Sequence, residues 1–364
     1  MSLESPLAKE HEKLGAAMGV RFGARLPETD GDFAAEYRRA LETAAVADTN
    51  FQLVAELAGP DRLRYLNAVS TGDIRDLEPG RSALGLLLNP QGRILAELRT
   101  LALADRLMVF SHAMSAERTL KTLEQYIIMD DVALADRSAE YATLALVGPA
   151  ARAVIDELAG APAIAPPDGS HRETVLGGMA CRLHSPTHLG LPGVELIAGR
   201  DRIEELWRML VEATARHGGG PAGYAALDAV RLEAGVPWFG ADFDERVIPH
   251  EAGLEHSHIS YTKGCYTGQE IVERVRSRGQ VNRRRVGLVF SGEGVPLAGA
   301  KLTAGGGDVG WITSAADSPL VGRAIGMGYL RREFHAVGSR VDWAGGVAEV
   351  VALPLGASGP QRDR

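Results

Sequence analysis

The sequence predicts an α+β protein in which two related β-α-β units precede a small all-β unit. The first observation is an internal repeat: a strand, a Gly-Pro pair and a helix follow one another in residues 57–69 and again in residues 146–158. Chance similarity of two Gly-Pro turns is the alternative. The second observation is the pattern after Arg283, where short alternating segments are separated by glycine turns at roughly ten-residue spacing, as in a small barrel or sandwich.

The first unit follows a polar lead-in. Residues 1–45 are treated as an N-terminal extension of unknown function, with one expected helix at Phe33–Leu41. The unit itself begins near Val46. Its expected strands are Phe51–Leu57, Leu84–Leu88, Ile94–Leu103 and Leu107–Phe110, and its expected helices are Asp61–Val69 and one beginning at Ser115.

The second unit carries the other copy of the repeat. Strands at Met179–Leu183 and Val194–Ala198 precede an amphipathic helix at Arg200–His217 and a shorter one at Tyr224–Glu233. The all-β unit spans residues 284–355, with expected strands at Val286–Phe290, Gly310–Ser314, Ala324–Tyr329 and Val347–Val351. We expect the tail, residues 356–364, to be disordered.

Composition excludes several classes of protein. The chain has 364 residues, 45% hydrophobic and 24% charged, as in a soluble protein of two or three packed units. A net charge of -8 argues against direct nucleic-acid binding, because nucleic-acid-binding surfaces are usually basic. No apolar run approaches the roughly 20 residues that span a bilayer, and the N-terminus lacks a secretory signal. We therefore expect a cytoplasmic protein without membrane partners.

The segment of residues 263–270 carries the clearest chemical signal. Gly264 and Gly268 flank Cys265 and allow backbone angles that are closed to other residues, so the thiol can be lifted out of the interior. A helix N-terminus and the nearby Lys263 favour thiolate over thiol. The sequence therefore predicts an exposed, reactive Cys265; the alternative is a buried, inert cysteine.

A helix is expected directly after this thiol. Thr267 and Glu270 have the spacing of a capping box, and apolar residues follow at helical spacing. Cys181, far from Cys265 in the chain, makes neither a disulfide framework nor a zinc site with it, so we expect both thiols to be reduced.

These eight residues are similar to the signature Lys-Gly-Cys-aromatic-x-Gly-Gln-Glu of the folate-binding YgfZ branch of the glycine cleavage T-protein superfamily. The matching positions are Lys263, Gly264, Cys265, Tyr266, Gly268, Gln269 and Glu270. Further similarity lies in the helix containing Arg231 and in Ile248–Leu254, so that the resemblance covers about Val46 to Leu353. The resemblance implies that residues 46–283 form a T-protein-like folate-binding domain.

The resemblance implies a ring of three subdomains, two ferredoxin-like and the last a β-barrel, around a central tetrahydrofolate pocket. It implies that Glu195, in a Gly-x-Glu strand, contacts the pterin ring, because a carboxylate accepts two adjacent donors. Arg231 is the second folate candidate. The alternatives are a solvated strand carboxylate for Glu195 and an ion pair for Arg231.

One departure from the T-protein pattern affects the expected chemistry. The T-protein carries a catalytic aspartate pair after a Gly-Gly-Ile-hydrophobic turn. Here Ala96 and Glu97 follow the corresponding segment, Gly92–Leu95. Because alanine cannot hold a proton, Glu97 is the remaining acid–base candidate at this place.

Two charged clusters have open interpretations. The first is a set of potential metal ligands without standard zinc spacing, to which we assign no metal: His250, Glu251, Glu255, His256 and His258. The second is the basic run that ends in Arg283, Arg284 and Arg285. It is either a solvated cationic face or an anion patch for a folate polyglutamate tail or another partner.

The preferred hypothesis is a tetrahydrofolate-binding accessory protein. The resemblance implies support for iron–sulfur cluster assembly or repair, including clusters of radical enzymes that modify tRNA. Tetrahydrofolate or a one-carbon derivative is then the cofactor, together with a transient iron–sulfur cluster. The expected partners are iron–sulfur client or scaffold proteins, which would bind at Cys265. The alternatives are a folate-dependent aminomethyltransferase or related one-carbon transferase, and a non-catalytic folate-binding docking module.

Overall fold

The structure is a computed structural model that describes residues 3–161, 166–187 and 189–355. The predicted disordered tail lies outside these residues. The chain forms two units. Unit 1 contains Met1–Asn89, Leu95–Leu227 and Ser257–Thr267; unit 2 contains Pro90–Ile94, Asp228–His256 and Gly268–Arg364. No helix of the described residues is both long and apolar enough to cross a membrane.

The N-terminal lead-in is more structured than its polar sequence predicts. The expected helix is present as α2 (Phe33–Glu42), whose N-cap Asp32 accepts from the N–H groups of Ala34 and Ala35. The structure adds α1 (Ala8–Lys13) and a three-stranded sheet of order β1-β3-β2, formed by Leu3–Glu4, Ala24–Thr29 and Ala17–Arg21. The hairpin was missed because Pro27 interrupts the strand pattern of β3, where it pairs with Met18 next to a register shift.

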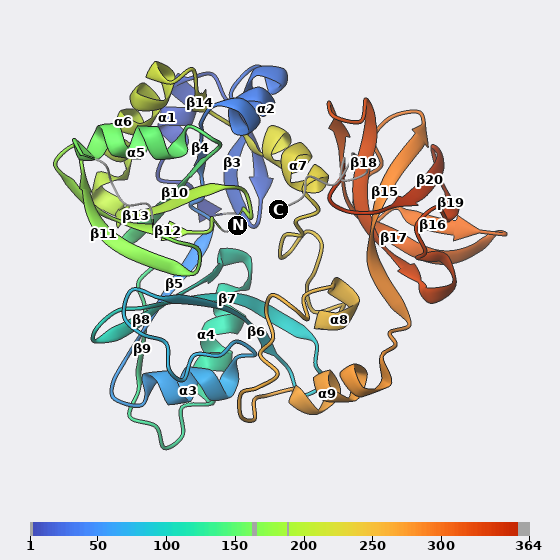
Figure 1. Cartoon of the computed structure of the whole chain (residues 1–364), viewed down its shortest axis with the longest axis horizontal. Coiled ribbons are helices and arrows are strands. Elements are labelled where there is room, and N and C mark those ends of the chain that lie inside the picture. Colours follow the sequence, from blue (N-terminus) through green and yellow to red (C-terminus); the bar gives the residue numbers. More distant parts are fainter. Residues whose placement is uncertain (1–2, 162–165, 188, 356–364) are drawn as a thin grey trace, which may run out of the picture. The chain divides into compact units, whose positions relative to one another are not determined.

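The first predicted β-α-β unit forms a five-stranded sheet of order β6-β7-β8-β5-β9 within unit 1 (Figure 1). Its strands are β5 (Gln52–Ala58), β6 (Ser82–Leu88), β7 (Ile94–Ala102), β8 (Arg106–His112) and β9 (Ala133–Asp136). Helices α3 (Arg62–Val69) and α4 (Ala116–Gln125) contribute Tyr65, Leu66 and Leu123 to the apolar core of this sheet. The predicted strands and helices of this unit are thus confirmed.

The second unit forms a six-stranded sheet of order β11-β12-β13-β10-β4-β14, also in unit 1. Its strands are β4 (Ala45–Asp48), β10 (Tyr141–Val147), β11 (Ser170–Leu176), β12 (Met179–Ser185), β13 (Gly193–Gly199) and β14 (Gly220–Pro221). Helices α5 (Ala151–Ala159) and α6 (Ile203–Arg216) pack on it, and Trp207 of α6 is fully buried in the shared core.

The two Gly-Pro turns are structurally equivalent. Gly59 follows β5 with φ 106°, and Gly148 follows β10 with φ 103°. A Cβ at Gly59 would lie 2.2 Å from the carbonyl oxygen of Asp131, and one at Gly148 would lie 2.6 Å from that of Thr43. Both positions therefore require glycine for the same two reasons, a left-handed backbone and a close approach of another chain segment. Each turn follows a strand and precedes a helix, so the order of strand, Gly-Pro turn and helix is present at both places.

Unit 2 contains a closed barrel of strand order β15-β18-β17-β16-β19-β20. Its strands are β15 (Arg283–Gly292), β16 (Lys301–Ala304), β17 (Gly307–Ser318), β18 (Arg323–Arg331), β19 (Arg340–Trp343) and β20 (Gly346–Val351), drawn in orange and red in Figure 1. Closure leaves no unpaired sheet edge, which favours the barrel over the sandwich left open by the sequence. The unit also holds α8 (Pro249–Ala252), α9 (Gln269–Arg278) and most of α7 (Tyr224–Glu233).

Candidate functional site

Strand β7 directs its neighbouring residues Ala96 and Glu97 to opposite faces of the sheet. Ala96 is buried in the core of the five-stranded sheet together with Leu98, whereas Glu97 is 21% exposed at its side chain. Successive residues of a strand point to opposite faces, so only one of the two positions can face a site on the polar side of the sheet. The alanine therefore fills a core position, and Glu97 is the acid that this strand presents.

Glu97 is held by His258. The Nε2 atom of His258 lies 2.9 Å from Oε1 of Glu97, and its Nδ1 atom lies 2.7 Å from Oγ of Ser257. The histidine backbone is fixed as well, since its carbonyl accepts a hydrogen bond of 2.6 Å from the Thr71 hydroxyl. Both nitrogens of this buried ring therefore have partners, and the ring is oriented toward the carboxylate.

The charge of Glu97 follows from its surroundings. Burial alone would raise the pKa of this carboxyl, but the hydrogen bond and charge of His258, with smaller effects of His112 and Arg99, lower the pKa to about 2. Glu97 is therefore an anion throughout the physiological range of pH.

A second buried charge pair connects β7 to β13. Arg99 is two residues from Glu97, and its Nη1 atom lies 2.5 Å from Oε2 of Glu195 on β13. Gln52 connects the two: its amide nitrogen donates to Oε1 of Glu195 at 2.5 Å, and its oxygen accepts from Arg99 at 2.9 Å. The Glu195 side chain is only 1% exposed, with Nδ1 of His184 at 3.7 Å. The structure thus excludes the solvated carboxylate for Glu195.

Arg231 forms the ion pairs that the sequence left open as an alternative. Its guanidinium, 1% exposed, lies 2.8 Å from Asp228, is paired with Asp242 and stacks over Trp238 at 4.7 Å. Burial opposes its charge, but Asp242 and Asp228 outweigh burial and raise its pKa. Asp242 also accepts from the hydroxyls of Thr313 and Ser314 in β17. Arg231 thus links α7 to the barrel inside unit 2.

Lys263 of the eight-residue motif donates hydrogen bonds to backbone carbonyls at the C-terminal end of α3. Its ammonium donates to the carbonyl oxygens of Asn67, Ser70 and Gly72 at 2.5, 2.7 and 2.6 Å. These carbonyls lie at or just after the last turn of the helix, where no intrahelical donor is available. Burial lowers the pKa of Lys263 to about 8. The ammonium also lies 5.3 Å from the ring centroid of buried Tyr266.

The thiol of Cys265 is exposed, as predicted, whereas Cys181 is buried. Gly264 does not adopt a left-handed backbone, and a Cβ there would lie 3.2 Å from Nη2 of Arg75, the mobile end of a long side chain. The reactivity of Cys265 stays a prediction.

The predicted capping box of α9 is wrong. Gly268, with φ 82°, is the N-cap, and no side chain caps the helix. With Thr267 as the N-cap, the helix would begin at Gly268 and Glu270 would be its third residue. Gly268 instead has a left-handed backbone, so the helix begins at Gln269 and Glu270 is its second residue.

The three arginines at the start of β15 are engaged within unit 2. Arg283 pairs with Glu251 at 3.0 Å, Arg284 pairs with Glu255 at 2.7 Å, and Arg285 donates to the carbonyl oxygen of Ala252 at 2.8 Å. Burial lowers the pKa of Arg285. Alternation along the strand also directs Arg284 away from its two neighbours. The three residues therefore do not form one free cationic face.

The sequence does not predict the pairing of Glu97 with His258 or of Arg99 with Glu195, because the partners are distant in sequence. The sequence places His258 near His256 and His250 as potential metal ligands, but within the described ranges no three His, Cys, Asp or Glu side chains are placed to hold a metal ion. Arg99 had a usable signal, since it shares a strand face with Glu97.

Comparisons with known proteins agree with this architecture. The model of the GCVT N-terminal domain matches residues 7–259, and that of the glycine cleavage T-protein C-terminal barrel domain matches residues 283–355. An aminomethyltransferase of Streptomyces coelicolor is 30% identical over 355 residues, covering 95% of each chain. An aminomethyltransferase of Chloroherpeton thalassium is 28% identical over 342 residues, covering 93% of each.

A solved structure is similar over nearly the whole chain. It is the glycine cleavage system aminomethyltransferase T from Bartonella henselae, which aligns with a TM-score of 0.88 at 25% identity and covers 97% of this chain and 98% of that one. The family models together match most of the chain, in the order and with the barrel found here. This chain therefore belongs to the glycine cleavage T-protein family.

Proposed function

We propose that this protein binds tetrahydrofolate and transfers a one-carbon unit to it from an aminomethyl donor. The observation that carries the proposal is the ionised Glu97 carboxylate held 2.9 Å from His258 on the polar side of β7. The similar proteins of Streptomyces and Chloroherpeton are named aminomethyltransferases, which supports the reaction class.

The pKa of Glu97 decides its part in the transfer. A carboxylate with a pKa of about 2 is a weak proton acceptor, because efficient bases have pKa values near the working pH. Glu97 instead supplies a fixed negative charge, which stabilises the cationic aminomethyl carbon as its bond to the donor breaks. The C–S bond of the donor breaks, and the leaving sulfur takes up the proton that the folate nitrogen loses when it bonds to that carbon. Ammonia leaves with the proton of the second folate nitrogen when this nitrogen closes the methylene bridge. His258 holds the Glu97 carboxylate in position for both steps.

The donor and acceptor groups around Glu195 fit the pterin ring of tetrahydrofolate. Oε1 of Glu195 accepts a hydrogen bond from the uncharged amide N–H of Gln52. A pterin N–H is also an uncharged donor, so it can take the place of this amide. We propose that the pterin replaces Gln52 at this oxygen while Arg99 keeps its pair with Oε2. Arg231 is not assigned to folate, because Asp228 and Asp242 occupy its guanidinium.

Two measurements test the transfer. Calorimetric titration with 5-formyltetrahydrofolate tests the folate site, and we expect micromolar affinity that falls about tenfold in Glu195→Gln. A single-turnover assay of ammonia and methylene-tetrahydrofolate formation from an aminomethyl-lipoyl donor tests the chemistry. Glu97→Gln should lower its rate by two orders of magnitude or more, roughly the effect of losing one electrostatic stabiliser. Glu270→Gln, an exposed change on α9, is the matched control. No turnover by the unmodified protein, with folate still bound, would exclude the transferase.

A second function is favoured by the exposed Cys265 in its eight-residue motif. We infer that a folate-binding accessory protein would meet an iron–sulfur client or scaffold at this thiol, with folate bound elsewhere on the chain. Cys265→Ser separates the two functions, since a transferase that depends on Glu97 and His258 keeps its turnover in this variant. Iron–sulfur enzyme activity in cells that carry only Cys265→Ser should fall if the accessory function holds. Unchanged activity there would remove the thiol from the mechanism.

A further inference from the structure

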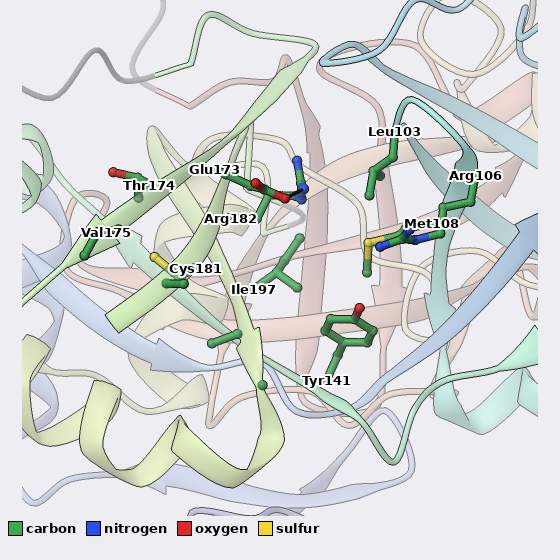
Figure 2. Close-up of a pocket in the computed structure, with 13 residues that line it drawn as sticks. Leu103, Arg106, Met108, Tyr141, Glu173, Thr174, Val175, Cys181, Arg182 and Ile197 are labelled. Atoms are coloured by element: carbon green, nitrogen blue, oxygen red, sulfur yellow. Dashed lines mark hydrogen bonds and ion pairs between the residues drawn. The ribbon is translucent and has the colours of Figure 1, made fainter. Parts of the chain in front are cut away.

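One cavity of unit 1 has no part in the proposed transfer. Its volume is about 370 Å³, and Figure 2 shows the side chains around it. The walls come from both sheets of the unit: the turn between β7 and β8, the start of β10, the β11–β12 hairpin and the end of β13. This volume lies within the range of small-molecule sites.

Arg182 brings a positive charge into this cavity with little compensation. Its side chain is 13% exposed, and its anionic partner Glu173, on the neighbouring strand, is 79% exposed. Its other partner is uncharged: Nη1 of Arg182 donates to Nδ1 of His171, whose Nε2 donates to the carbonyl oxygen of Ala102. Burial and the charge of Arg182 lower the pKa of His171 to about 4, which keeps this ring neutral. A neutral ring therefore fixes Arg182 in position, and among the residues that the structure describes its paired anion is the solvent-exposed carboxylate of Glu173.

Arg106 adds a second guanidinium on the opposite wall, and its side chain is directed toward the same space in Figure 2. It is paired with Glu56 at 3.1 Å and with Asp105 at 2.9 Å, neither of which lines the cavity. The pKa of Arg182 is lowered chiefly by burial; Glu173 opposes this effect, and the charge of Arg106 adds a smaller lowering. Arg106 therefore places a second guanidinium, already paired with two carboxylates, beside the same space.

The inner wall is apolar. Met108 and Ile197 belong to the core cluster between the two sheets, and Leu103 and Tyr141 pack against it. In Figure 2 the Tyr141 ring lies beside Ile197 with its hydroxyl turned toward the arginines. The cavity thus combines an apolar floor with a phenol and two guanidinium groups at its rim.

We propose that this cavity binds a small organic monocarboxylate whose apolar body lies on Met108 and Ile197 and whose carboxylate replaces Glu173 on Arg182. Two parallel hydrogen bonds from a guanidinium suit a carboxylate, and the fixed orientation of Arg182 reduces the entropy lost on binding. Neither Glu97 nor His258 lines the cavity, and the proposal does not rest on the proposed transfer.

The test uses 1-naphthoate as a probe and its uncharged analogue 1-naphthamide, each titrated into the full-length protein by calorimetry. We expect 1-naphthoate to bind with a dissociation constant below about 1 mM and the amide to bind at least roughly tenfold more weakly. Arg182→Met keeps an apolar side chain of similar length and should weaken 1-naphthoate binding by roughly tenfold or more. Arg172→Met, an exposed arginine on the same hairpin that does not line the cavity, is the matched control and should bind normally.

Methyl NMR provides a readout that does not depend on the folding of a variant. Addition of 1-naphthoate should shift the methyl signals of Met108 and Ile197 and leave those of Val286 in the barrel unchanged. Equal affinity for acid and amide, no binding by the unmodified protein, or shifts spread over both units would each overturn the proposal.

Discussion

The Nε2 atom of His258 lies 2.9 Å from Oε1 of Glu97, although 161 positions separate the two residues. One residue is on a central strand of the five-stranded sheet, and the other precedes the cysteine motif in a segment without regular structure. This contact joins strand β7 to the segment that leads into the cysteine motif.

The Glu97–His258 pair predicts that the free energy of unfolding falls at acidic pH. The folded-state pKa of Glu97, about 2, lies below the ordinary value of 4.5, so its contribution to the free energy of unfolding is complete above 4.5 and is lost as the pH falls toward 2. The contribution is at most about 3 kcal/mol. Urea unfolding between about pH 6 and pH 3 should show a shallower loss of stability in Glu97→Gln than in the unmodified protein. Identical slopes would contradict the ionised pair, and Glu270→Gln should behave like the unmodified protein.

Removal of Arg231 should destabilise unit 2. Arg231→Met leaves Asp242 buried without its cationic partner, and such changes cost about 3–5 kcal/mol. Arg246→Met is the matched control, because Arg246 pairs with Asp244 at the surface and exposed pairs contribute less than about 1 kcal/mol. Thermal unfolding followed by calorimetry measures both. Equal melting temperatures for the two variants would show that the buried pair is not structural.

Lys263 should stabilise the end of α3 locally. Lys263→Met removes one ammonium from three carbonyl oxygens, and we expect a loss of about 2–3 kcal/mol in the free energy of opening this helix. Lys263→Arg should not restore it, since a planar guanidinium cannot converge on the three acceptors as a compact ammonium does. Amide hydrogen exchange across Arg62–Val69 measures the effect. Lys301→Met, at an exposed pair with Asp308, should leave this exchange unchanged.

The two thiols should differ in their rate of alkylation. Cys265 is exposed, whereas burial raises the pKa of Cys181 to about 12 and keeps that thiol protonated. Native protein treated with iodoacetamide at neutral pH should be modified at Cys265 alone, and Cys181 should react only after unfolding. Peptide mass spectrometry identifies the modified site, with Cys265→Ser as the control. Modification of Cys181 in the folded protein would contradict its burial.

The repeat, the helices and the barrel strands were predictable because their signals are local. Gly59 and Gly148 show this most clearly: each lies between a strand and a helix, and each is required by a positive φ and a nearby carbonyl. The hairpin of β2 and β3 was not predicted, because the proline in β3 removes the usual strand pattern.

The chemical roles were less predictable than the elements. The sequence identified Glu97, Glu195, Arg231 and Cys265 as residues of interest, and it determined which of them carry charge or a thiol. Tertiary structure decided their partners: His258 for Glu97, Arg99 for Glu195, and Asp242 for Arg231. The reason is physical, since the energy of a charged group depends on burial and on charges within a few ångströms. Those neighbours are brought together by sheet pairing and loop paths, which leave no spacing pattern in the sequence.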